Sequence, residues 1–324
     1  MTKSAVKSAY LGWLAAAIAG ERGASMLSAA GEKSLVLGYA TGYDVADVAV
    51  FIRSLRAYYQ GPCALVVDRD PGLRAFLASY DVEALDAPNQ AEDSGDWQPH
   101  PVVSRFAGFG SLLADRPWVR HALLTDVRDV VFQGDPFLPE PRALEMFAEC
   151  DDTLLQHDFN MKYLRSIVGD EMAQSLGGEA CICVGTVMGE RESLIRFCRL
   201  ILLLGAIPRS EVGGAFGADQ ATANLAVHMG LIQATVEPNF RRVATVGMTP
   251  AGEVSFDGHV MRNPDGSVSP IVHQHDRHAE ILEGIQALWG QGVEARVRVK
   301  ANKTLSDRSQ KWAGSLRKRL PELR

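Results

Sequence analysis

One stretch of the chain constrains its fold more than any other, an apolar segment that ends on two carboxylates. Residues Ala122–Leu124 form a run of strand length, Asp126 follows it, and Asp129 comes three residues later. Two carboxylates at the end of a buried strand repel each other and are costly to desolvate. A divalent cation is the simplest partner that keeps both ionised, and Mg²⁺ and Mn²⁺ prefer such oxygen ligands. We therefore expect a metal site that also binds phosphates, on an α/β sheet that binds nucleotides.

Arg128 stands between the two acids and leaves an alternative open. A guanidinium pairs with a carboxylate as readily as with a phosphate, because both offer it two oxygens. Two surface carboxylates neutralised by Arg128 would need no ion. If a nucleotide binds here, Arg128 would instead contact its phosphates.

Strand-like and helix-like segments alternate before this stretch and predict an α/β sheet. Residues Ser34–Ala40 form an apolar run too short for a helix, and Asp44–Tyr59 follows with helical spacing of its apolar residues. Cys63–Val67 has the composition of a second strand. In an open α/β sheet, ligands bind at the carboxyl ends of the strands, so residues that directly follow a strand are candidates for binding.

Thr41, Gly42 and Tyr43 follow the first predicted strand, and Asp68 follows the second. Glycine allows the backbone to approach a ligand closely, and Tyr43 can stack on a base. Asp68 can accept hydrogen bonds from a base or a ribose. An ordinary loop tyrosine and a turn aspartate before Pro71 explain these side chains equally well.

Two later helix starts carry charged side chains. Arg105 begins a predicted helix, where it faces the nucleotide unless it is a solvent-exposed arginine. Asp219 precedes a helix predicted to begin at Gln220, and a carboxylate there is favoured as a helix cap whatever its function.

A histidine-rich segment near the end of the chain offers a nitrogen ligand. His273 ends a predicted strand, and His275, Arg277 and His278 follow it. The three histidines could form a zinc site, but the two acids predict a harder, oxygen-rich site that takes one histidine. We therefore expect His273 to join Asp126 and Asp129 in the metal site, against the alternative of a simple core or surface histidine.

Five segments of the chain, in this order, resemble those of GT-A-fold glycosyltransferases. They are Ser34–Tyr43, the acidic segment from Asp126 to Phe137, Cys183–Gly189, Ala218–Asn224 and Ile271–Arg277. The first resembles the nucleotide-binding strand and loop, and the third the lining of the sugar pocket. The acidic segment differs from the family's Asp-x-Asp, because Arg128 stands at the second Asp. The resemblance implies an α/β fold with a GT-A-type, single-domain, Rossmann-like mixed sheet flanked by helices.

The resemblance also implies roles for the residues already singled out. Asp126 or Asp129 and His273 would hold Mn²⁺ or Mg²⁺, and Arg105, Arg128 and Arg277 would neutralise the donor diphosphate. Asp219 and Gln220 would position the sugar. A UDP-sugar donor and retention of configuration are favoured, while the acceptor, a carbohydrate, lipid or small molecule, stays open.

The middle of the chain is predicted from local pattern alone. Pro141–Glu149 has helical spacing, Thr153–Asp158 begins as a strand, and Lys162–Leu176 is a further helix. His157 could face the acceptor, although a surface histidine is the stronger interpretation. Cys181 and Cys183 have no second pair that would complete a zinc site, so we expect core cysteines.

The ends of the chain are predicted to lie outside the catalytic domain. Residues 1–33 form an amphipathic helix and connector, or a signal peptide, with an apolar segment too short to span a bilayer. Residues 34–290 form the domain. Residues 291–324 form a basic helical tail, solvated or in weak contact with an anionic membrane.

Composition excludes one class of partner and favours one compartment. The chain has 33 basic and 39 acidic side chains and a net charge of -6, so non-specific nucleic-acid binding is not expected. Its five cysteines have no framework spacing, which is typical of a reducing cytoplasm.

Two other functions remain alternatives. A non-catalytic nucleotide- or sugar-binding module would retain the fold, and Arg128 within the acidic motif supports it. A sugar-phosphate nucleotidyltransferase needs a glycine-rich basic loop early in the chain, which Thr41–Asp44 lacks.

Overall fold

A computed structural model describes residues 12, 14–15, 33–87, 101–205 and 217–293. The chain divides into two units after Val293, and all of the second unit, which holds the predicted basic tail, lies outside the described ranges. Most of the predicted N-terminal helix and connector also lies outside them. No helix within the described ranges has both the length and the apolar character to cross a bilayer.

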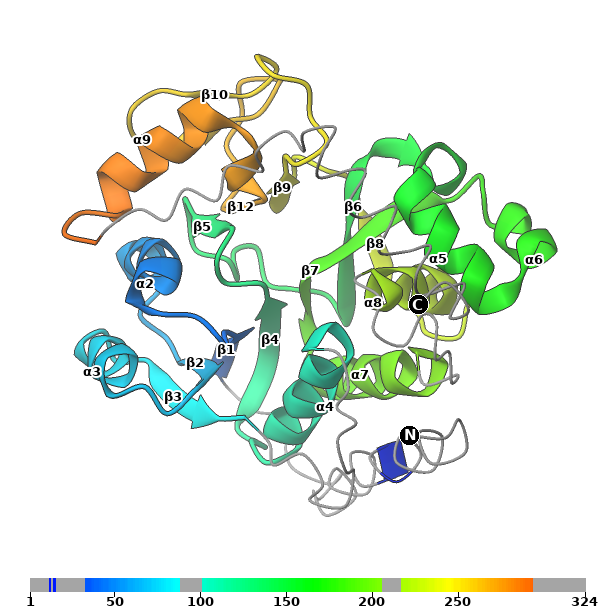
Figure 1. Ribbon diagram of the computed structural model, residues 1–324, viewed down its shortest axis with the longest axis horizontal. Helices are drawn as coiled ribbons and strands as arrows, with labels where there is room; N and C mark the ends of the chain where they lie inside the picture. The colour runs from blue at the N-terminus through cyan, green and yellow to red at the C-terminus, as the bar shows by residue number, and fades with distance from the viewer. Residues whose placement is uncertain (1–11, 13, 16–32, 88–100, 206–216, 294–324) are drawn as a thin grey trace, which may run out of the picture. The chain divides into compact units, whose positions relative to one another are not determined.

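The fold is built on a mixed sheet of seven strands in the order β3-β2-β1-β4-β7-β6-β8 (Figure 1). Strands β1 to β4 are parallel where they pair, β7 runs antiparallel to β4 and to β6, and β8 is parallel to β6. The strands are β1 (Lys33–Tyr39), β2 (Cys63–Val67), β3 (Glu83–Asp86), β4 (Val119–Thr125), β6 (Leu144–Thr153), β7 (Ala180–Glu190) and β8 (Thr235–Glu237).

Helices cover both faces of this sheet, which explains why its inner strands are apolar almost throughout. Helices α4 (Pro101–Ala114) and α7 (Arg191–Gly205) contribute to one core cluster, and α2 (Val45–Tyr58) and α3 (Pro71–Ser79) to the other. Strand alternation divides β1 between them, because Leu37 belongs to the first cluster and Val36 to the second.

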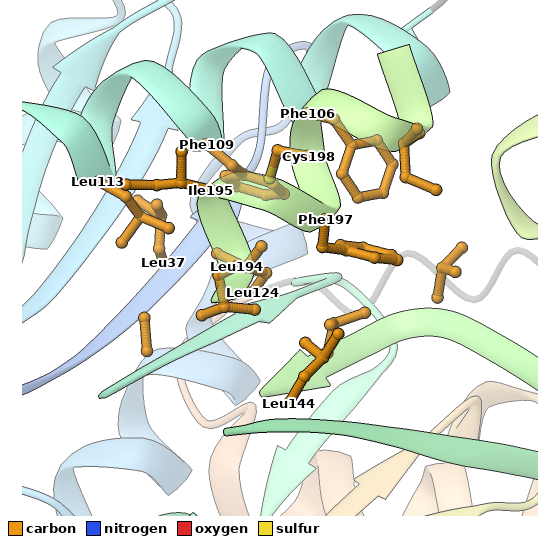
Figure 2. Packing of buried hydrophobic residues seen from close by; sticks show 14 of the residues in the cluster. Leu37, Phe106, Phe109, Leu113, Leu124, Leu144, Leu194, Ile195, Phe197 and Cys198 are labelled. Atoms are coloured by element: carbon orange, nitrogen blue, oxygen red, sulfur yellow. The ribbon is translucent and has the colours of Figure 1, made fainter. Parts of the chain in front are cut away.

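Aromatic packing fixes α4 against α7 in the first cluster (Figure 2). Phe106 of α4 meets Phe197 of α7 edge to face, with ring centroids 5.8 Å apart, and Phe109 lies 6.1 Å from Phe106. All three are almost fully buried. Burial of a phenylalanine contributes about 1.5–3 kcal/mol, so this trio holds α4, and with it Arg105, firmly against the sheet.

The remaining elements include a second, smaller sheet and further helices. A second sheet has the order β5-β12-β9 and contains β5 (Val130–Phe132), β9 (Val243–Thr245) and β12 (Ile271–His273). The other elements are α5 (Asp158–Val168), α6 (Asp170–Ser175), α8 (Ala218–His228), α9 (Ala279–Trp289), the 3₁₀ turns Leu154–Gln156 and His275–Arg277, and the pair β10 (Ser255–Phe256) and β11 (Met261–Arg262).

Three predictions for the middle of the chain were wrong. Residues predicted as the helix Pro141–Glu149 instead form most of β6, which pairs with β7 and β8. The predicted strand Thr153–Asp158 is a 3₁₀ turn that leads into α5. The helix predicted over Lys162–Leu176 is two helices divided at Gly169, whose φ of 86° does not fit a helix.

The order of the strands places a crevice where the sequence expected ligands. From β1 the chain moves outward to β2 and β3, then returns to β4 on the other side of β1. Such a reversal opens a crevice beyond the carboxyl ends of the two central strands. Thr41 follows β1 and Asp126 follows β4. The fold is therefore a mixed α/β sheet flanked by helices, as predicted, and it is compatible with a Rossmann-like fold.

Candidate functional site

A pocket of about 270 Å³ lies beyond the ends of β1 and β4. Ten of the twelve predicted site residues line it: Thr41, Tyr43, Arg105, Asp126, Arg128, Asp129, Asp219, Gln220, His273 and Arg277. The two that do not are Gly42 and Asp68. The fold thus gathers residues that are widely separated in the sequence.

The two acids and the late histidine meet at one end of this pocket. Nε2 of His273 lies 3.7 Å from Oδ2 of Asp126 and 3.9 Å from Oδ1 of Asp129. A divalent ion of this class binds at about 2.1 Å, so two ligands of one ion are at most about 4.2 Å apart. The three side chains therefore fit a shared divalent cation, and they form one of the two groups with such spacing among the described residues.

Backbone pairing holds these ligands in place. The amide of Asp126 donates to the carbonyl of Gly185 at 2.7 Å, and the amide of Gln274 donates to the carbonyl of Asp129 at 2.8 Å. His273 of β12 stands opposite Val130 of β5, one residue after Asp129. The ligand group is thus built where the small sheet meets the end of β4.

Gly185 makes room for the imidazole. A β-carbon at this position would overlap Cε1 and Nε2 of His273 and would lie 3.0 Å from Oδ2 of Asp126. The resemblance placed Gly185 beside a sugar; it lies within β7, lines the pocket and approaches His273. On the other side of the ring, Sγ of Cys183 is 3.7 Å from Nδ1.

The charges of Asp126, Asp129 and His273 shift one another's pKa values. Burial would raise the pKa of Asp126, but Arg105 and His273 outweigh it and hold that pKa at about 2. Burial, reinforced by the nearby Asp126, raises the pKa of Asp129 above its ordinary value. Burial would lower the pKa of His273, yet Cys183 and the two aspartates facing it raise that pKa well above normal. Asp126 and Asp129 thus share the charge of one histidine, and a divalent cation bound in place of its proton would neutralise both carboxylates.

Arg105 lines the pocket and joins two carboxylates there. Its Nη1 forms an ion pair with Oδ1 of Asp126, and its Nη2 lies 2.8 Å from Oδ2 of Asp219. Asp219 is buried, in the first turn of α8, and the cap of that helix is Gly217 instead. Arg105 therefore leaves Oδ2 of Asp126 to face His273 and holds Asp219 at the pocket wall.

The other two predicted arginines have partners outside the acidic group. The guanidinium of Arg128 lies over the ring of Tyr43, 5.6 Å from its centroid, and its charge partly offsets the burial that raises the pKa of Asp129, without an ion pair between the two. Nη1 of Arg277 lies 3.1 Å from Oδ2 of the neighbouring Asp276. Both arginines still line the pocket, where either can meet an anionic ligand.

Asp68 supports the first loop from behind. Its Oδ2 accepts a hydrogen bond of 2.5 Å from the amide of Gly42, whose φ of 77° requires the left-handed region. Asp68 thus fixes the loop that carries Thr41 and Tyr43. Asp68 itself does not line the pocket, so its predicted contact with a base or a ribose gains no support.

Two of the three late histidines lie outside the ligand group. His275 is buried, and burial lowers its pKa to about 4. Nε2 of His278 lies 2.8 Å from the carbonyl oxygen of Val246. Among the described residues, His273 groups with Asp126 and Asp129 and with neither of these histidines. The three-histidine zinc site is therefore not formed.

A second buried group, which the sequence analysis missed, lies beside Gln220. Glu149 lines the pocket, and His157 and Cys181 lie within ligand distance of it. Nε2 of Gln220 donates to Oε2 of Glu149 at 2.5 Å. The predicted helix over Pro141–Glu149 hid this carboxylate, because only the β6–β7 pairing brings Glu149 near Cys181.

Comparison with known proteins adds no family to this description. No family model matches the chain, and no curated protein matches it either. The site is therefore interpreted from its own residues.

Proposed function

We propose that the protein is a metal-dependent glycosyltransferase of the GT-A type, which transfers a sugar from a nucleotide-diphosphate donor to a hydroxyl group. The observation that carries this proposal is the meeting of Asp126, Asp129 and His273, whose ligand atoms all lie within 4.8 Å of one another in a pocket at the sheet's crevice. Acids and one imidazole of this kind suit Mn²⁺ or Mg²⁺ together with a phosphate ligand.

The proposed division of labour follows the positions of the side chains. When bound by Asp126, Asp129 and His273, a divalent cation supplies Lewis acidity and positive charge at the leaving diphosphate. Arg128 and Arg277 add charge from the pocket wall. Arg105 keeps Asp126 and Asp219 in fixed positions through its two ion pairs.

The donor is proposed to enter across the loop after β1. Thr41 and Tyr43 would contact the nucleoside, and the pocket of about 270 Å³ would enclose the diphosphate and the sugar. Asp219 and Gln220 line the same pocket and would position that sugar. UDP-sugars are the favoured donors and retention the favoured outcome, on the resemblance stated above. All five cysteines are free thiols, which supports activity in the reducing cytoplasm.

A second candidate is a module that binds a nucleotide or a sugar without turnover. The observation that favours it is the ion pair between Arg105 and Asp126, which occupies one oxygen of a predicted metal ligand. Binding without reaction would then be the function of the pocket.

The first experiment measures binding and turnover separately. We expect Mn²⁺ and UDP together to raise the melting temperature, because a ligand that binds only the folded state stabilises it. UDP release from a panel of UDP-sugars should then depend on Mn²⁺ and stop with EDTA. His273→Gln should abolish both effects, whereas His259→Gln, at an exposed histidine, should change neither.

The outcomes separate the candidates. UDP release that continues in EDTA would count against the metal site. Stabilisation by UDP and Mn²⁺ without release from any sugar nucleotide, across a range of acceptors, would favour the binding module.

A further inference from the structure

The pocket has a second polar wall that the metal-ligand group does not use. Glu149 is buried on β6 and lines the pocket. Four side chains converge on its Oε2: Gln220 at 2.5 Å, His157 at 3.2 Å, Asn160 at 3.4 Å and Cys181 at 3.5 Å. One oxygen of this carboxylate is therefore held by the protein itself.

The other oxygen, Oε1, has no hydrogen-bond partner among the described residues and is not sealed from solvent. Every hydrogen bond that the side chain of Glu149 accepts from described residues ends on Oε2. A carboxylate oxygen that is fully buried without a hydrogen-bond partner is costly. Oε1 of Glu149 does not belong to the fully buried atoms without a partner. Oε1 is thus left to accept a hydrogen bond from a ligand.

The charge of Glu149 is kept by its neighbours. Burial would raise its pKa, but His157 and Gln220 outweigh burial and hold the pKa below its ordinary value. An ionised carboxylate is a strong hydrogen-bond acceptor because it is charged, and a low pKa makes it a weak proton acceptor. Glu149 is therefore suited to bind a hydroxyl group, not to deprotonate it.

An aromatic ring lies in the same pocket. Phe159 is 40% exposed although it is large and apolar, and it lines the pocket with Glu149. Its ring packs against Tyr163 with centroids 5.0 Å apart, and a β-carbon at Gly217 would lie 2.6 Å from its Cζ. The ring is thus held in place by Tyr163 and Gly217 while part of it stays accessible.

We propose that Glu149 and Phe159 form the subsite for the transferred sugar. Oε1 of Glu149 accepts a hydrogen bond from a sugar hydroxyl, and the ring of Phe159 packs against the apolar C–H groups of the same sugar. This inference rests on the proposed function and names the residues that recognise the transferred group.

The spacing of the two groups supports this assignment. Cys181 touches Glu149, and Cys183 touches His273. Both cysteines lie on β7, two residues apart, so they share one face at a separation of about 6–7 Å. Glu149 and the metal-ligand group therefore contact neighbouring positions of one strand, which agrees with a sugar that lies next to the diphosphate.

A zinc ion is the competing occupant of the second group. Glu149, His157 and Cys181 have suitable spacing and donor atoms for it. However, Oε2 already accepts from the amide groups of Gln220 and Asn160, and both would have to turn away from a metal ion. The hydrogen-bond pattern therefore favours the free carboxylate.

The test compares two dissociation constants by calorimetry in saturating Mn²⁺. In the unmodified protein, at least one of UDP-glucose, UDP-galactose and UDP-N-acetylglucosamine should bind about 10-fold or more tightly than UDP, as expected for a hydrogen bond to a charged group. Glu149→Gln should reduce this ratio to about 1–2-fold and leave UDP affinity within about 2-fold. Phe159→Leu should lower the same ratio while leaving UDP binding unchanged.

Two matched controls separate recognition from stability. Glu145→Gln makes the same change on the same strand at a buried glutamate that pairs with Arg242 at 2.9 Å and does not line the pocket. It should lower stability and keep the binding ratio. Tyr58→Leu changes an aromatic residue of similar exposure, also outside the pocket lining, and should keep both UDP affinity and the ratio.

Three results would overturn the subsite. The first is an unchanged ratio in Glu149→Gln with normal UDP binding, which leaves the proposed function intact. The second is one equivalent of zinc in the purified protein that is lost in Cys181→Ser. The third is failure of the unmodified protein to bind UDP with Mn²⁺, which refutes the proposed function and the subsite together.

Discussion

The imidazole of His273 occupies the space that a side chain on Gly185 would fill. A β-carbon there would overlap two ring atoms and also crowd Oδ2 of Asp126. The carbonyl of the same residue accepts from the amide of Asp126 at 2.7 Å. One residue of β7 thus sets the position of two predicted metal ligands without contributing a side chain.

Gly185→Ala should weaken Mn²⁺ binding by about 10-fold or more, because displacement of supporting groups around a ligand typically costs 10–100-fold. No charge is changed, so the effect is steric. Calorimetric titration with Mn²⁺ measures it. Gly178→Ala is the control, since a β-carbon there meets no atom within 4 Å. Equal affinities in the two variants would contradict the close approach of Gly185 to His273.

Asp129→Asn should have opposite effects on stability and on metal binding. Burial and the charge of Asp126 raise the pKa of Asp129, so its ionised form is disfavoured in the folded protein. In EDTA near neutral pH, the amide should raise the free energy of unfolding by about 1 kcal/mol. Mn²⁺ affinity should fall by about 10-fold or more. Urea unfolding with and without Mn²⁺ measures both.

The control for that prediction has the opposite sign. Amide hydrogen bonds from Val260 and His259, with Arg262, lower the pKa of Asp257 to about 2. Asp257→Asn should therefore lower stability and leave Mn²⁺ affinity unchanged. If Asp129→Asn instead lowers stability in EDTA, the ionised carboxylate of Asp129 is stabilised by the protein without a cation, which contradicts the prediction.

Arg105→Met should destabilise the protein by about 3–5 kcal/mol, since it leaves buried charge unpaired. Asp219 is 5% exposed and lies 2.8 Å from Arg105. In Arg105→Met with Asp219→Asn, part of this loss should be recovered, because the unpaired charge is removed. A double-mutant cycle by urea unfolding measures the coupling. Additive losses would contradict a shared ion pair.

The pair of Glu149 and His157 should make stability depend on pH. The carboxylate of Glu149, 3.2 Å from Nε2 of His157, raises the pKa of His157 above the unfolded value of 6.5. This contribution is fully present below pH 6.5 and is lost as pH rises through the raised folded pKa. Glu149 has a lowered pKa, so its contribution is present above the unfolded value of 4.5 and is lost as pH falls through the folded value.

Urea unfolding of the unmodified protein and His157→Gln across pH 5–9 tests this dependence. The difference in unfolding free energy between them should be largest on the acidic side, near pH 6, and should decrease above pH 7. A difference that is constant over this range would mean that His157 is neutral throughout.

Much of the candidate site was accessible from the sequence because strand ends are local features. Asp126 directly follows an apolar run, and His273 ends another, so both could be placed at a sheet edge before the fold was known. The meeting of these two edges follows from the strand order, since β12 pairs with β5 next to Asp129. The sequence predicted the residues, and the topology brings them together.

The features that were missed depend on tertiary pairing. Leu144–Glu149 contains good helix formers, yet β7 and β8 on its two sides make it a strand, so packing overrides local propensity. Glu149 was missed for that reason. Arg105 was expected at a diphosphate, but its partners Asp126 and Asp219 come from distant segments that no spacing rule connects.

The position of β12 has a consequence for how the protein is made. It lies between β5 and β9 but is translated after both. During synthesis, β5 and β9 are therefore made before the strand that pairs with both. That strand, β12, follows β5 by more than a hundred residues. The ability to hold a cation therefore arrives late in synthesis, and nascent chains arrested before His273 should be unable to complete the ligand group.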